Sequence, residues 1–463
     1  MREPSRARRA IAGVRSSSIP PDLCRLAPAP FGRRTAAFLA PHGDFSYTRS
    51  PFAHWPFTHR KLPLAVSLSK RVQKVKPSPT LAVTARAAKL KSEGKDIIGL
   101  GAGEPDFDTP VHIADAGVDA IRKGITRYTS VDGTTELKDA IIAKFQRDNG
   151  LTYERNQILV SSGAKQSCFN VCAALLDPGD ECVIPAPYWV SYPDMALLAD
   201  GVPVSVYAGP DQGYKITPAQ LAAAITPRTK MLFINSPSNP TGAAYTKAEL
   251  QALGAVLHKH PQVAIASDEM YEHIYWATEP FTSFVQANPE LYDRTITING
   301  VSKAYAMTGW RIGYCGGPKA IVNAMTTIQG QSTSNASSIS QRASTVALNG
   351  DQTCVAVMNK AFKERHDYVV AGLNGIPGIS CLAGAGTFYA FAQVDGAMRA
   401  LGLKDDTDFA EYLLLQAGVA VVPGSGFGAP GHMRISFACS MKTLEDALGR
   451  IRRVLSVEVA KRA

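Results

Sequence analysis

Through the middle of this chain, short strand-like runs of apolar and β-branched residues alternate with longer segments of helical periodicity. Strands separated by helices predict βαβ units and a mainly parallel sheet, and therefore a fold of the α/β class. Such a sheet binds its ligand just beyond the carboxyl ends of its strands, so we expect the chemistry directly after each run. The strand-like runs are QILVSS (157–162), ECVIPA (181–186), KMLFINS (230–236), VAIASDE (263–269) and RTITING (294–300), with helical segments such as 218–227 and 247–260 between them.

The pattern changes near residue 346, which indicates a second, smaller α+β domain. A long helical segment is followed by three strand-like runs and a closing helical segment. The helical segment LAVTARAAKLKSEG (81–94), which precedes the first strand, is expected to pack with this domain. The predicted organisation is a disordered leader over 1–69, an N-terminal part of the small domain over 70–113, a large domain over 114–345 and a C-terminal part of the small domain over 346–463.

The segment TPVHIADAGVDAIRKG (109–124) carries both a start and a stop signal for a helix. Thr109 offers a capping side chain, Pro110 suits the first helical position, and Gly124 suits the residue just past the end. We therefore expect a helix that begins at Pro110.

The first 69 residues differ in composition from the rest. They contain eleven Arg or Lys and three acidic residues, and so hold most of the net charge of +10. Because little net charge remains elsewhere, the composition does not predict a nucleic-acid partner. Low acidity and the absence of an apolar period predict disorder. Two interpretations stay open: a dispensable leader on a cytoplasmic protein, which we favour, or an organelle transit peptide.

No apolar run approaches the roughly 20 residues of a membrane span, and the N-terminus lacks a signal-peptide core, so we expect a soluble protein without a membrane partner. The eight cysteines form no C-x-x-C pair, and the closest two, Cys168 and Cys172, have helical spacing. We expect reduced, mostly buried thiols and no metal site. Glu104, Asp106 and Asp108 crowd one turn but lack the spacing of a hard-cation loop.

Polar and aromatic residues follow the strand-like runs, where the ligand is expected. After the first run, the small-residue turn 162–166 opens a helix and offers free N–H groups to a phosphate. Trp189 follows the second run, Asn239 lies on a rigid loop after the third, and Asp268 ends the fourth. Each has a structural alternative when taken alone: a helix start, a core aromatic or a turn.

Lys303 lies in TINGVSKAYAMTGWRIGY (297–314) with no acidic residue near it in sequence. An uncompensated buried ammonium is costly, so this lysine is either exposed or has a chemical reason to be there. A lysine that binds an aldehyde, a strand-end aspartate, an asparagine, a tyrosine (Tyr271), a stacking aromatic and a phosphate turn together match the needs of pyridoxal phosphate.

Eight ordered motifs from about Arg71 to the C-terminus carry a resemblance to a known family. They are KPSPTLAV, GAGEPDFDTP, SSGAKQS, PAPYWVSYP, NSPSNPTG, SDEMYEHIY, SKAYAMTGWRIGY and MRISFA. On these motifs the chain resembles the class I, fold-type I, pyridoxal-phosphate-dependent aminotransferases, and within them the bacterial aspartate and prephenate aminotransferase branch. The resemblance implies a large cofactor-binding α/β domain with a mainly parallel seven-stranded sheet between helices, a smaller α+β domain from both termini, and a homodimer with shared active sites.

The resemblance also implies a role for each matching residue. Lys303 would bind the aldehyde of pyridoxal 5′-phosphate and move protons at the reacting carbon, and Asp268 would keep the pyridine nitrogen protonated. Tyr271 and Asn239 would hydrogen-bond the phenolic oxygen, and Trp189 would stack on the ring. The phosphate would be held by Gly163, Ala164, Lys165, Ser302 and Arg311, and by Tyr128 given to the neighbouring subunit.

For the substrate, the resemblance implies that Arg434 grips the α-carboxylate. Lys165 would read a distal carboxylate and Lys76 would bear on prephenate, although both match surface lysines as well. Further substrate contacts would come from Gly103, Trp189 and Asn239. The implied reaction moves the amino group of aspartate or glutamate to 2-oxoglutarate, oxaloacetate or possibly prephenate, giving arogenate, by a ping-pong mechanism.

Other functions share parts of this sequence pattern. The fingerprint Gly424-x-Gly426-x-x-Ala429 is nominally that of an oxidoreductase, but Pro430 and a strand follow it instead of a helix. A ligand-sensing DNA-binding protein would need an added winged-helix domain, for which the leader has no apolar period. An aminotransferase for aromatic or alanine donors, or a lyase or decarboxylase of the same fold, shares every cofactor residue, and Arg434 favours transamination.

Overall fold

A seven-stranded sheet forms the centre of the computed structural model, which describes residues 66–75 and 79–462. The strand order is β2-β8-β7-β6-β5-β3-β4. β8 is antiparallel to β2 and β7, whereas the other neighbouring strands run parallel, so the predicted α/β sheet is confirmed. The strands are β2 (Ile158–Ser161), β3 (Glu181–Ala186), β4 (Val202–Tyr207), β5 (Thr229–Asn235), β6 (Ala264–Asp268), β7 (Thr295–Gly300) and β8 (Gly313–Gly316).

The alternation of side chains along the strands assigns each face of the sheet to its own helices. Cys182 and Ile184 of β3 pack in one core with α5, α6 and α10, whereas Val183 between them packs with α7, α8 and α9. A third core joins α3, α4 and α11. These helices are α3 (Val111–Arg122), α4 (Thr135–Asn149), α5 (Ala164–Leu175), α6 (Ser191–Leu198), α7 (Pro218–Ala224), α8 (Lys247–Leu257), α9 (Phe284–Ala287), α10 (Lys319–Ser332) and α11 (Ser338–Asn349).

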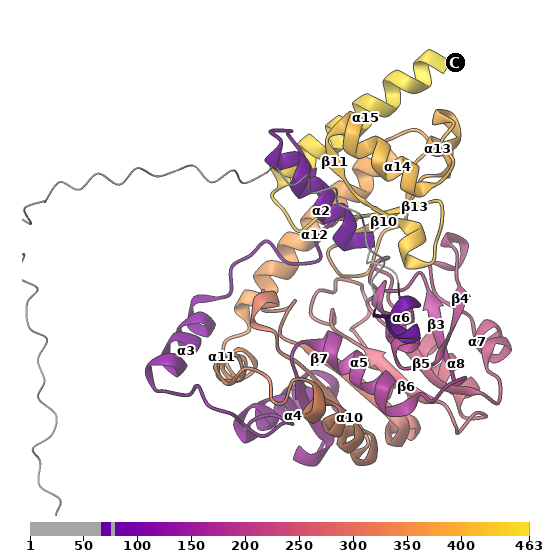
Figure 1. Cartoon of the computed structure of the whole chain (residues 1–463). Coiled ribbons are helices and arrows are strands. Elements are labelled where there is room, and N and C mark those ends of the chain that lie inside the picture. Colours follow the sequence, from indigo (N-terminus) through magenta and orange to yellow (C-terminus); the bar gives the residue numbers. More distant parts are fainter. Residues whose placement is uncertain (1–65, 76–78, 463) are drawn as a thin grey trace, which may run out of the picture. The chain divides into compact units, whose positions relative to one another are not determined.

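Both ends of the described chain contribute to the remaining elements. β1 (Ile98–Gly99) pairs in parallel with β11 (Val419–Ala420), and β12, β13, β10 and β9 form an antiparallel sheet in that order. The indigo helix α2 (Pro79–Ser92) lies beside β11 in Figure 1, and Ala87 packs against Ala420. The other elements are α1 (Lys70–Gln73), α12 (Thr353–Asn374), β9 (Ser380–Cys381), β10 (Tyr389–Gln393), α13 (Asp395–Leu401), α14 (Asp406–Tyr412), a π-helical turn (Leu413–Ala417), β12 (Val422–Pro423), β13 (His432–Ser436) and α15 (Met441–Arg462).

One predicted helix start was wrong by one residue. α3 begins at Val111 with Pro110 before it. Thr109 does not cap the helix; its hydroxyl donates to Ala306 O at 2.8 Å and accepts from Trp310 Nε1 at 3.0 Å. The side chain therefore ties the start of the helix to the loop that carries Lys303.

The predicted leader lies outside the described residues except for 66–69, which are exposed. The residue boundaries of the two predicted domains stay a prediction. Within residues 66–75 and 79–462, none of the helices combines the length and apolarity needed to cross a membrane.

Candidate active site

A cavity of about 440 Å³ opens at the carboxyl ends of the central strands. Its volume is within the range of about 300 to 1,000 Å³ that is common for small-molecule sites. Most of the predicted site residues line it. They are Gly103, Ala164, Lys165, Trp189, Asn239, Asp268, Tyr271, Ser302, Lys303, Arg311 and Arg434.

Two predicted residues do not line the cavity, and a third is not described. Gly163 lies beside the cavity, at the start of α5. Tyr128 is 92% exposed and is not part of the cavity lining. Lys76 lies outside the described residues.

The N-terminus of α5 and the loop after β7 meet at one wall of the cavity. Gly163 has a φ of 88°, and a Cβ atom at this position would strike the guanidinium of Arg311. Arg311 donates from Nη2 to Ser162 O at 3.3 Å and from Nη1 to Thr308 O at 3.0 Å. A glycine at residue 163 therefore lets a guanidinium approach the unpaired N–H groups of a helix start, which is an anion-binding arrangement.

Asp268 ends β6 and is 6% exposed. Burial raises the pKa of its carboxyl group, although the hydroxyl of Tyr192, which donates to Oδ2 at 2.6 Å, opposes this effect. The backbone N–H of Met270 donates to Oδ1 at 3.2 Å. The carboxylate is thus held in one orientation at the edge of the cavity.

Arg434 of β13 is 2% exposed and has no acidic partner within salt-bridge distance among the described residues. Its Nη1 donates to Asn239 Oδ1 at 2.9 Å and its Nη2 donates to Gly101 O at 2.8 Å. The guanidinium carbon lies 4.3 Å from the ring centroid of Tyr389 and 4.9 Å from that of Phe427. Nε is buried without a hydrogen-bond partner, so the fixed guanidinium is prepared for an anion.

Lys303 follows β7, and its amine donates to Gly103 O. Burial lowers the pKa of Lys303 to about 8; Arg434 and Arg311 add to this effect, whereas Glu104 opposes it. About a tenth of the amine is therefore neutral, and nucleophilic, at pH 7, which is far more than for a lysine with its ordinary pKa.

Several residues of this site were not predicted. Glu104, Thr308, Tyr192 and Tyr389 all line the cavity. Tyr389 OH lies 3.1 Å from Tyr271 OH, and a Cβ atom at residue 103 would lie 2.8 Å from the hydroxyl of Tyr389. The available signal for Tyr192 was its place three residues after Trp189, in the same strand-end segment.

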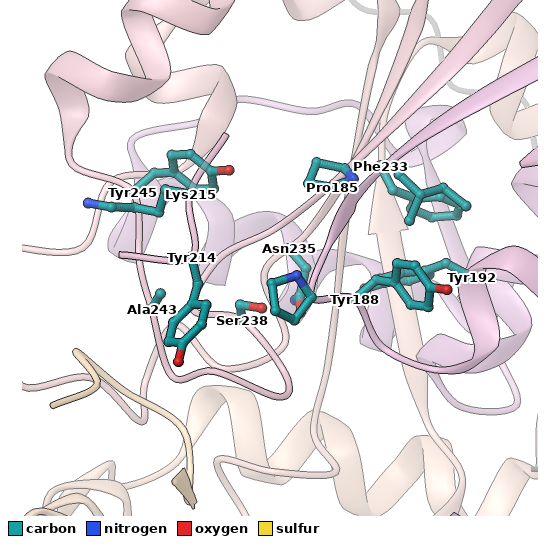
Figure 2. Close-up of a pocket in the computed structure, with 12 residues that line it drawn as sticks. Pro185, Tyr188, Tyr192, Tyr214, Lys215, Phe233, Asn235, Ser238, Ala243 and Tyr245 are labelled. Atoms are coloured by element: carbon teal, nitrogen blue, oxygen red, sulfur yellow. The ribbon is translucent and has the colours of Figure 1, made fainter. Parts of the chain in front are cut away.

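Beside this site lies a second cavity of only about 20 Å³. Figure 2 shows Phe233 and Tyr192 on one side of it and Tyr214, Lys215 and Tyr245 on the other. Tyr192 lines both cavities, so its ring lies between them. The small cavity has no room for a cofactor, which leaves the larger one as the candidate site.

Comparisons with known proteins agree with this geometry. Residues 95–451 match the family described as aminotransferase class I and II. The aspartate/prephenate aminotransferase of Nitrosomonas europaea is 57% identical over 397 residues, which cover 84% of this chain and 100% of that protein.

Two solved structures are also similar. The crystal structure of the aspartate aminotransferase from Rhizobium meliloti has 50% identity and a TM-score of 0.82, and the match covers 84% of this chain and 99% of that one. The aspartate aminotransferase from Thermus thermophilus with maleate has 42% identity and a TM-score of 0.79, with coverages of 84% and 100%. The chain therefore belongs to the class I and II aminotransferases, enzymes that depend on pyridoxal 5′-phosphate.

Proposed function

We propose that this enzyme takes the amino group of aspartate or glutamate and passes it to a 2-oxo acid, with prephenate as a further acceptor. The observation that carries this proposal is the buried Arg434, which has no acidic partner among the described residues and lines one cavity with a second cation, Lys165. Two cations on one cavity suit a dicarboxylic amino acid. The names of the related enzymes, which act on aspartate and in one case on prephenate, support the same substrates.

The residues present fit pyridoxal phosphate. The cavity offers an amine with a lowered pKa for its aldehyde, a buried carboxylate for its ring nitrogen and a guanidinium at a helix start for its phosphate. The cofactor, when bound, supplies an aldehyde that condenses with amines and a ring that withdraws electrons from the substrate's Cα.

Each residue then has a task in holding the cofactor. The backbone amides of Ala164 and Lys165, the hydroxyl of Ser302 and the guanidinium of Arg311 would bind the phosphate. Trp189 would stack on the ring. Because Asn239 Oδ1 accepts from Arg434, its Nδ2 is left to donate to the phenolic oxygen, together with Tyr271. These residues are Gly163, Ala164, Lys165, Trp189, Asn239, Asp268, Tyr271, Ser302, Lys303 and Arg311.

Two residues would control the protons of the reaction. Lys303, once its amine is free, takes a proton from the Cα of the substrate and returns it at C4′ of the cofactor. Asp268 holds the proton on the pyridine nitrogen, because a carboxylate next to that nitrogen favours its charged form. Arg434 fixes the α-carboxylate, so that the Cα–H bond stays within reach of Lys303.

A homodimer with shared sites is the second part of the proposal. Apolar side chains of α3 and of the segment after it are open to solvent: Val111 is 75%, Ile121 57% and Tyr128 92% exposed. Large exposed apolar side chains of this kind would suit an interface with a second subunit. Tyr128 would reach the phosphate of the neighbouring subunit, and Lys76 would act on the choice of acceptor.

The cytoplasm is the compartment we propose. All cysteines among the described residues are free thiols, most of them buried, as is usual in a reducing compartment. An organelle remains the alternative if the leader is a transit peptide.

The test is a steady-state panel of aspartate, glutamate, alanine and phenylalanine as donors against 2-oxoglutarate, oxaloacetate and prephenate. Aspartate or glutamate should give the highest kcat/KM. Lys303→Ala should lose the cofactor adduct that borohydride traps in the wild-type enzyme. Preference for alanine or phenylalanine would overturn the substrate assignment, and turnover without an amino acceptor would indicate a lyase.

A matched variant separates the two cations. Lys165→Met keeps most of the apolar stem of the side chain but removes the charged amine, whose Nζ lies 4.9 Å from the ring centroid of Trp189. We expect kcat/KM to fall for aspartate and to change little for alanine, which lacks a distal carboxylate. Equal losses for both donors would assign Lys165 to the cofactor alone.

A further inference from the structure

Tyr192 is the only side chain in the described part of the chain whose hydroxyl or N–H group donates to the carboxylate of Asp268 at a normal hydrogen-bond distance. Its hydroxyl lies 2.6 Å from Oδ2, whereas the thiol of Cys168 lies 3.9 Å from the same oxygen. Oδ1 is held separately, by the backbone of Met270. Within the described residues, Oδ2 therefore depends on one phenol for its hydrogen bond at a normal distance.

Packing fixes the ring of Tyr192 from two sides. It stacks on Phe233 of β5, with ring centroids 4.3 Å apart, and meets the edge of Trp189 at 5.3 Å and 86°. Tyr192 itself is 2% exposed and is the second residue of α6. A ring held in this way delivers its hydroxyl in one direction, so the hydrogen bond to Asp268 is built into the core.

The electrostatics of the site make Tyr192 the donor and Asp268 the acceptor of this hydrogen bond. Burial raises the pKa of Tyr192 well above its ordinary value, and the nearby charge of Asp268 raises it further, so the phenol stays protonated and donates. Burial also raises the pKa of Asp268, and the donated proton opposes that shift. The hydrogen bond from Tyr192 thus favours the ionised form of Asp268, whereas burial favours the protonated form.

We propose that Tyr192 is a positioning residue for transamination, which keeps Asp268 ionised and directed at the pyridine nitrogen of the cofactor. The inference rests on the proposed function, because it assumes that Asp268 faces that nitrogen. In this proposal Tyr192 acts through Asp268. It takes no part in the binding of the α-carboxylate by Arg434 or in the chemistry of the Lys303 amine.

The first test compares Tyr192→Phe with Tyr188→Phe in the holoenzyme. Tyr188 comes from the same segment and lines the same small cavity (Figure 2), but its hydroxyl forms no hydrogen bond with a described residue. In Tyr192→Phe we expect kcat for aspartate to fall about tenfold or more, as for a lost hydrogen bond to a charged group, with KM little changed. Tyr188→Phe should keep the wild-type kcat.

The pH profile provides a readout that a purely structural role would not move. Without the donor, Asp268 accepts a proton more readily, so the acid limb of kcat should shift to higher pH in Tyr192→Phe and stay in place in Tyr188→Phe. A wild-type acid limb and kcat in Tyr192→Phe would overturn the proposal, as would equal losses in the two variants.

A double-mutant cycle tests whether Tyr192 acts through Asp268. When Asp268→Asn is already present, adding Tyr192→Phe should cost little further activity, because the carboxylate it supports is gone. Fully additive losses would overturn the inference while leaving the proposed function intact. The proposed function fails separately, if the wild-type enzyme neither retains the cofactor nor transfers an amino group.

Discussion

Lys303 needs a neutral amine to attack an aldehyde, and its surroundings supply one. Burial lowers the pKa of this lysine to about 8 from 10.5. We predict that the rate at which the apoprotein recombines with pyridoxal phosphate rises with pH to a plateau with a midpoint near 8. The measurement is the appearance of cofactor absorbance after mixing, in a series of buffers of equal ionic strength.

The control for this prediction is a free lysine derivative under the same conditions, whose rate should keep rising towards the ordinary lysine pKa of about 10.4. If the recombination rate of the apoprotein follows the free amine, the surroundings of Lys303 do not tune it. In that case the lowered pKa would have no part in cofactor capture.

Residues directly after the strands could be predicted from sequence, and residues that act across elements could not. Asp268, Asn239 and Lys303 follow apolar runs, and the geometry of a parallel sheet brings such positions to one edge. Tyr192 belongs to the site because it contacts Asp268, and Tyr389 because it contacts Tyr271. The local sequence pattern does not indicate these partners. For Arg434, the sequence pointed to the residue but not to the rings on either side of its guanidinium.

At the scale of elements, strands with continuous apolar runs were predictable, and two strands with weaker patterns, β4 and β8, were not. β4 (Val202–Tyr207) contains a proline and lies at one end of the strand order, and β8 is only four residues long with glycine at both ends. Neither has the strong strand pattern of β5 or β7. Packing against neighbouring strands and helices holds these two strands in place. Their positions in the sheet therefore came only from the structure.

Helix α4 is joined to the loop after β6 by a buried ion pair. Lys144 contacts Glu272, and both side chains are almost fully buried. Burial alone would raise the pKa of Glu272, but Lys144 keeps it below the ordinary value. Replacing Lys144 with Met leaves the buried carboxylate of Glu272 without its lysine, so we predict a loss of about 3 to 5 kcal/mol in the free energy of unfolding. The midpoint of urea denaturation, followed by circular dichroism, measures it.

The matched control is the double variant Lys144→Met, Glu272→Leu. It removes both charges and keeps apolar volume, so it should recover much of the lost stability. Asn149 and Asn299 donate to Glu272 at 2.8 Å each, and their loss of a partner limits the recovery. A double variant no more stable than the single one would mean that packing, and not the unpaired charge, causes the loss.

At the scale of the whole molecule, the described chain encloses most of a site but leaves Tyr128 outside it. This side chain is 92% exposed, on the segment that follows the exposed apolar residues of α3. A tyrosine so exposed contributes to a phosphate site only if a second copy brings its own site to it. The proposed homodimer is therefore a statement about catalysis as well as about assembly.

Hybrid dimers test this prediction. In a dimer of one Lys303→Ala subunit and one Tyr128→Phe subunit, the site that keeps Lys303 receives an intact Tyr128 from its partner, if tyrosines are exchanged. We expect the Tyr128→Phe homodimer to bind pyridoxal phosphate several-fold more weakly, because one phosphate contact is lost. The purified hybrid should recover wild-type affinity at its one competent site.

If Tyr128 served its own subunit, every site of the hybrid would lack one of the two residues. Affinity at the Lys303 site would then stay as weak as in the Tyr128→Phe homodimer. Cofactor titration of the two-tag-purified hybrid, with sedimentation to establish the dimer, separates these outcomes.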